Sequence, residues 1–212
     1  MNFIIFATFI IFTSILSMTI KRHNRSEKKQ REQFWEREKR ANQVRRKPLD
    51  DLDYVTIPLE DLPTTVMAED VIIQDCLDTL AFLSHEKIVN LAGYTNTDLK
   101  LAYGTANITA LSQYDQNFTL LAQTLQKWAD TLHGAGYMAE AQQVLEYAVL
   151  AIRSDAGTSY RLLASIYDQN GEQEKVAVLY DTALSLTSHS GKTIARILQE
   201  NYPYIDSPSS KS

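Results

Sequence analysis

The chain has 212 residues, a length typical of one domain with or without short extensions. It carries 21 Lys/Arg against 26 Asp/Glu, a net charge of −5, and its single cysteine, Cys76, excludes a disulfide framework within the chain. The charge is unevenly spread, since residues 21–47 hold 12 Lys/Arg against 4 Asp/Glu. This segment therefore has a net charge of +8 and the remainder −13, a split typical of a basic tail beside an acidic domain.

Residues 2–20 contain no charged side chain and are rich in Ile and Phe. As a helix they would rise about 28 Å, close to the thickness of a bilayer's hydrocarbon core. A cleaved signal peptide is the alternative, but no Lys or Arg precedes the apolar run. We therefore predict a transmembrane anchor over residues 1–20. Because the nearby positive charge follows it, we expect single-pass topology with the amino terminus outside and a cytoplasmic domain; an exported, anchored domain is the alternative.

Residues 21–47, from Lys21 to Lys47, are predicted to form a basic helical linker, which Pro48 ends. Apolar residues are too sparse there for a coiled-coil seam. The segment either is attracted to anionic lipid headgroups or serves as a solvated spacer. Nucleic acid is not expected as a partner, because the basic charge adjoins an apolar stretch.

The next segment, residues 48–65, alternates apolar and other residues at Val55, Ile57 and Leu59. Alternation is typical of an extended strand, but Pro58 excludes a central one. No other strand is predicted that could pair with it. We expect an extended arm lying on a helical domain.

Residues 66–201 are predicted to form this all-α domain, because apolar residues recur at helical spacing and no proline occurs between Pro63 and Pro203. Within an apolar helical pattern, Cys76 is expected to be a small buried side chain. Asn96 or Thr97 would cap one of the short helices. The expected helices cover residues 69–84, 86–91, 97–103 and 106–114, with a capping helix over 192–201 before a disordered tail at 202–212.

Two segments, about 122–155 and 157–188, align with a constant offset of 35 residues. Paired positions include Trp128 with Leu163 and Gly136 with Gly171. The full set of pairs resembles the tetratricopeptide repeat, a helix–turn–helix unit of about 34 residues. The other pairs are Ala129 with Ala164, Leu132 with Tyr167, Ala141 with Val176, Leu145 with Tyr180 and Ala148 with Ala183.

The resemblance has departures. Arg153 and Ser188 stand where the family usually has proline, and Val176 replaces a small residue. Two repeats are fewer than a stable solenoid needs, so the earlier helices are expected to form a divergent additional unit.

The resemblance to tetratricopeptide repeats implies a groove that binds an extended peptide. Carried over from the family, the groove-facing positions are Gln126, Asp130, His133, Arg161, Ser165 and Asp168. Their charges are mixed, and Arg161 is the only cation, so the Lys/Asn-rich carboxylate clamp of some family members is absent.

No catalytic, cofactor or metal site is predicted. None of His23, His85, His133 and His189 has neighbours at metal-ligand spacing. Residues 190–193 imitate the end of a phosphate-binding loop, but Leu186 stands where its first glycine is required.

We therefore expect a non-enzymatic, membrane-tethered scaffold or adaptor that binds a protein partner. The alternative is a structural subunit permanently embedded in a larger membrane complex; an enzyme of unfamiliar type is a third possibility. Thr13 and Ser17 form a small-xxx-small pair that could let two anchors pack, but no other feature supports a homo-oligomer.

Overall fold

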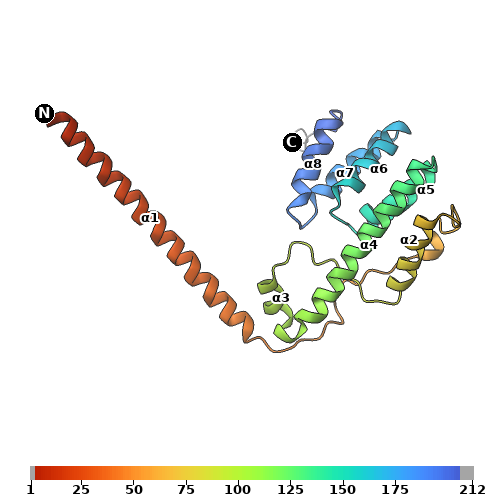
Figure 1. The fold of residues 1–212 in the computed structure, drawn as a ribbon, viewed down its shortest axis with the longest axis horizontal. Helices are drawn as coiled ribbons and strands as arrows, with labels where there is room; N and C mark the ends of the chain where they lie inside the picture. The colour runs from red at the N-terminus through yellow and green to blue at the C-terminus, as the bar shows by residue number, and fades with distance from the viewer. Residues whose placement is uncertain (1–2, 206–212) are drawn as a thin grey trace. The chain divides into compact units, whose positions relative to one another are not determined.

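A computed structural model describes residues 3–205, leaving out the side chains at 3–11, 13–15, 20, 24 and 26. Within this part the chain is helical and holds no strand beyond one isolated bridge (Figure 1). The chain divides into two compact units, which are described separately: Met1–Pro48 with Thr95–Ile108 form the first, and Leu49–Tyr94 with Thr109–Ser212 form the second. The predicted tail at 202–212 lies mostly outside the described residues.

The first unit contains one long helix, α1 (Phe3–Asn42), which joins the predicted anchor to the basic linker without a break and ends five residues before Lys47, where the linker helix was predicted to end. In the described part of the chain, no helix is long and apolar enough to cross a membrane. This finding contradicts the predicted transmembrane anchor over residues 2–20. It also contradicts both predicted single-pass topologies, the one with a cytoplasmic domain and the one with an exported domain. The apolar stretch is not a helix of its own, because it continues into a charged half from Lys21 onward. Most side chains of the predicted anchor lie outside those described.

Polar contacts hold the end of α1 against α3 (Asn96–Tyr103). Arg37 Nη2 donates to Asp98 Oδ1 over 2.5 Å, and Lys100 Nζ donates to Glu38 Oε2 over 2.9 Å. Thr95, one residue before the predicted caps, begins α3 with a capping box formed with Asp98. The segment after α1 is held as well, since the Lys47 amide donates to the Tyr103 carbonyl over 3.0 Å.

Within the second unit, a turn at residues 50–52 leads into an extended arm over residues 53–58, which a 3₁₀ turn follows at Leu59–Asp61. Ile57 and Leu62 are buried. The sequence predicted no strand that could pair with this arm, but in the structure Tyr54 forms an antiparallel β-bridge with Val89. The helix predicted over residues 86–91 is therefore not present.

The reason is that the backbone there bonds to other segments instead of to itself. The Ile88 carbonyl accepts from the Val55 amide over 2.9 Å, and the Val89 amide donates to the Tyr114 carbonyl over 3.3 Å. The Lys87 carbonyl accepts from the Asn117 side-chain amide over 3.0 Å.

The remaining helices belong to the second unit. Asp70 caps α2 by accepting from two amides of its first turn. The short helix predicted over 106–114 is instead the beginning of the long α4, preceded by a 3₁₀ turn at Thr105–Asn107. The bounds are α2 Val71–Leu83, α4 Ile108–Gly134, α5 Met138–Glu146 with a π-helical turn Tyr147–Ala151, α6 Gly157–Gln169, α7 Gln173–Leu184 and α8 Ser190–Asn201.

One hydrophobic core draws side chains from all these helices and from the arm. The paired positions of the two aligned segments are buried alike: Trp128 and Leu163 are fully buried, as are Ala129 and Ala164. Gly136 and Gly171 both have positive φ, 89° and 75°, at the turns that follow α4 and α6. Cys76 is buried as expected, and burial raises the pKa of its thiol.

Candidate functional site

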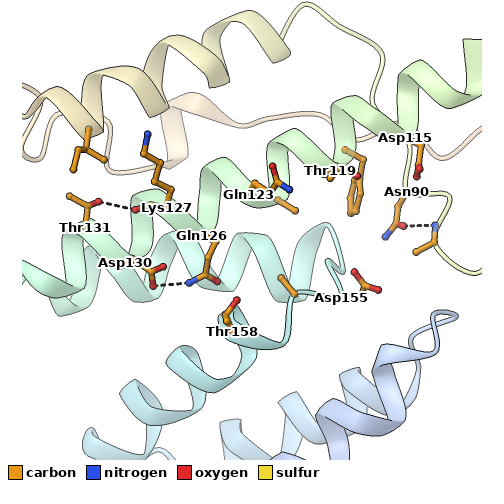
Figure 2. Close-up of a pocket in the computed structure, with 15 residues that line it drawn as sticks. Asn90, Asp115, Thr119, Gln123, Gln126, Lys127, Asp130, Thr131, Asp155 and Thr158 are labelled. Carbon is orange, nitrogen blue, oxygen red and sulfur yellow. Dashed lines mark hydrogen bonds between the residues drawn. The ribbon is translucent and has the colours of Figure 1, made fainter.

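A groove of about 780 Å³ lies on one face of α4 and is here called the α4 groove. After Asp115, the lining positions of α4 are the adjacent pairs 118/119, 122/123, 126/127 and 130/131, which recur every four residues and so lie on one side of the helix. Figure 2 shows these side chains in a row along α4, with α2 on one side and α6 on the other. The other walls are formed by Ile72, Asn90, Ala92, Asp155, Ala156 and Thr158.

The floor of the groove is apolar. Phe118 is 6 % exposed, and the other apolar lining residues are Ile72, Ala92, Ala122 and Ala156. Ile72 is an exposed side chain of α2, so its contact surface faces the groove rather than the core. Such a combination of apolar floor and polar edge is typical of a binding surface.

Asn90 fixes one end of the groove. Its side-chain nitrogen donates to the Arg153 carbonyl over 3.2 Å, and its side-chain oxygen accepts from the Ala92 amide over 3.0 Å. The loop after α2 is thereby held against the turn that leads into α6. That turn contains Arg153, a non-glycine residue with a φ of 53°.

Gln126 connects α4 to α6 near the middle of the groove. Its nitrogen donates to Asp130 Oδ1 over 2.7 Å, and its oxygen accepts a hydrogen bond from the buried hydroxyl of Ser159. Because both ends of the amide are bonded, its orientation is set before any ligand arrives.

Lys127 connects α4 to α2. Its ammonium lies 2.6 Å from Asp75 Oδ2, and this hydrogen bond raises the pKa of Lys127. Both side chains are at least half exposed, so the pair stabilises the unit only modestly.

The six predicted groove residues are not all brought together. Gln126 and Asp130 line the α4 groove, whereas Arg161 lines a second cavity of about 560 Å³ between α6 and α8. Ser165 accepts from Gln169 over 3.1 Å, and Asp168 accepts from the Tyr204 hydroxyl over 2.8 Å. His133, Ser165 and Asp168 line none of the three main cavities in the described part of the chain.

Four acidic or amide residues of the groove were not predicted from the sequence: Asn90, Asp115, Gln123 and Asp155. Asn90 lay in a segment predicted to be helical, and Asp155 lies at the end of the first aligned segment, outside the positions expected to face the groove. Asp115 follows the lining pattern of α4, so a single helix predicted over residues 108–134 would have included it.

Among the residues that the structure describes, no group of three or more His, Cys, Asp and Glu side chains could hold a metal ion. The resemblance to tetratricopeptide repeats stays a prediction. No protein-family model matches the chain, and no curated protein or solved structure has significant similarity to it.

Proposed function

We propose that this chain is a non-enzymatic protein-interaction module whose α4 groove binds a segment of a protein partner. The observation that supports the proposal is the groove itself, which combines an apolar floor with side chains that are held in place at its edges. Apolar contact supplies affinity, and pre-oriented polar groups supply specificity.

The length of the groove favours an extended ligand over a compact small molecule. The lining positions of α4 extend from Asp115 to Thr131, which corresponds to about 24 Å along a helix at 1.5 Å per residue. An extended peptide at about 3.3 Å per residue would span this length with roughly seven residues.

Site-specific photo-crosslinking in the native cells tests the proposal. A benzophenone amino acid replaces Gln123, which is exposed and lines the groove, or Gln116, which is exposed on the same helix outside it. We expect a protein adduct at Gln123 and none of the same mass at Gln116. Equal adducts at both positions, or none at Gln123, would contradict the proposal.

A structural subunit of a larger assembly is the second candidate, and α2 favours it. Val71 and Phe82 are 78 % and 58 % exposed, and their separation of eleven residues places them on the same face of that helix. Exposed apolar side chains gathered on one face are typical of a permanent interface. A crosslinker at Asp78, on this same face, would then capture one partner that also co-purifies at a constant ratio after washing at high salt.

A further inference from the structure

The α4 groove carries an excess of negative charge. Three carboxylates line it, those of Asp115, Asp130 and Asp155. The one cationic side chain among the lining residues, Lys127, is already paired with Asp75. A ligand in the groove therefore meets carboxylates without a matching cation.

These carboxylates retain capacity for further hydrogen bonds. An ionised carboxylate can accept about four. Asp130 accepts from Gln126 and Asp115 accepts from the Leu91 amide over 3.3 Å, one bond each. Asp155 accepts none from the residues that the structure describes, and it is partly shielded from solvent.

The three carboxylates are spread along the groove rather than gathered at one point. Asp115 and Asp130 are fifteen residues apart on α4, about 22 Å along the helix axis. Figure 2 shows Asp155 across from α4, in the turn just before α6 and between the other two along the groove. An extended segment would therefore pass a carboxylate near each end and another in between.

The apolar floor suits the side chains that would carry the opposite charge. Lys and Arg have long aliphatic stems that pack on apolar surface while their charged ends reach polar groups. Here the stems would contact Phe118, Ala122 and Ala156, and the charged ends would reach the carboxylates at the edges.

The surroundings favour the same ligand. The second unit contains 8 Lys/Arg and 21 Asp/Glu, a net charge of −13. Such a field attracts a cationic segment and repels an acidic one over roughly a Debye length, which is about 8 Å at physiological salt.

We propose that the α4 groove selects an extended, basic segment of a partner protein, with Lys or Arg side chains bound by Asp115, Asp130 and Asp155. This inference rests on the proposed function and specifies the partner's chemistry. It goes beyond the sequence analysis, which found only groups of mixed charge.

Peptide selection on the full chain tests the inference. A phage library of random dodecapeptides is selected on the protein, and the enriched peptides are synthesised and titrated by fluorescence anisotropy. The test variant combines Asp115→Asn, Asp130→Asn and Asp155→Asn, since asparagine keeps the acceptor oxygens that Leu91 and Gln126 use. The matched control combines Asp51→Asn, Asp78→Asn and Asp181→Asn, three exposed carboxylates outside the groove.

We expect enriched peptides with at least two Lys or Arg, and binding about tenfold or more weaker in the test variant than in the control, because the test variant loses three partly exposed ion pairs with the peptide. Affinity should also fall as salt rises.

Four outcomes would overturn the inference. Enriched peptides that lack Lys and Arg, or that lose the same affinity in both variants, would refute the basic ligand while leaving the proposed function intact if they crosslink at Gln123. The absence of any enriched peptide would refute both. A dimer that dissociates in the test variant would instead identify the basic α1 of a second copy as the occupant.

Discussion

The two units of this chain are stabilised by different means. The second unit has a core to which α2 and α4 through α8 all contribute, whereas the described side chains of the first unit include only two buried apolar residues, Ala41 and Leu99. The first unit depends on ion pairs and hydrogen bonds between α1 and α3. Apolar burial tolerates small shifts in geometry, but hydrogen bonds do not, so the first unit should be the more sensitive to local change.

The candidate site follows this division. The α4 groove lies wholly on the second unit, where Phe118 on its floor belongs to the core. A rigid support of this kind keeps the carboxylates and amides of the groove in place before a ligand binds, which lowers the entropic cost of binding. The predictions below test the contrast, beginning with the largest expected effect.

Truncating a buried leucine in each unit should give unequal results. Leu163→Ala should lower the free energy of unfolding of the second unit by about 2–5 kcal/mol, because Leu163 is fully buried in the core. Leu99→Ala should loosen residues 95–107 and leave the second unit's midpoint unchanged. Urea titration followed by segment-resolved hydrogen exchange measures both. If Leu99→Ala shifts the second unit as much as Leu163→Ala does, the two units unfold together and the contrast fails.

Substituting two glycines that have nearly identical φ distinguishes the cost of backbone strain from the cost of a steric clash. A side chain at Gly136, where φ is 89°, meets no atom within 4 Å, so Gly136→Ala should cost about 1–2 kcal/mol through φ alone. At Gly104, where φ is 88°, an added Cβ would lie 2.4 Å from the Arg45 carbonyl oxygen. Gly104→Ala should therefore cost more and displace the segment that follows α1.

The readout for this pair is hydrogen exchange. Protection should fall at residues 96–103 in Gly104→Ala and only around the α4–α5 turn in Gly136→Ala. Equal losses in stability for the two variants would show that the contact with Arg45 is relieved without consequence.

The smallest expected effect is a pH dependence of the contact between α1 and α3 in the first unit. Hydrogen bonds from Thr97 and Lys100 lower the pKa of Glu38 below its ordinary value of 4.5. A group whose pKa is lowered by folding stabilises the fold above its ordinary pKa and loses that contribution as pH falls through its folded value. Contact between α1 and α3 should therefore weaken as pH is lowered below 4.5 toward that value.

Amide chemical shifts of α3, recorded between pH 6 and pH 3, measure this weakening. Glu38→Gln should reduce the acid-dependent change and leave a smaller one from Asp98, whose pKa is lowered by its hydrogen bonds with Thr95. An unchanged titration in Glu38→Gln would exclude Glu38 as its source.

The sequence by itself determined the features that depend on local pattern. The helical spacing of apolar residues predicted the start of α2 to within two residues. The alignment of the two segments at a constant offset of 35 residues matched positions that are buried alike, such as Trp128 and Leu163. The turns at Gly136 and Gly171 followed from the same alignment. These features depend on residues close together in the chain, so a one-dimensional pattern can contain them.

Tertiary structure decided the rest, because it depends on contacts between distant segments. Residues 86–91 have a helical pattern, yet Ile88 and Val89 bond to Val55 and Tyr114 and form a bridge. The predicted anchor proved to be part of the longer helix α1, and no described helix is apolar and long enough to cross a membrane.

The candidate site shows the same limit. Three of the acidic and amide groups of the α4 groove, Asn90, Asp115 and Asp155, come from three separate segments. No spacing rule connects them, because only the packing of α2, α4 and α6 brings their side chains to one surface. A single helix predicted over its full length would have revealed Asp115, but the other two could be placed only by the fold.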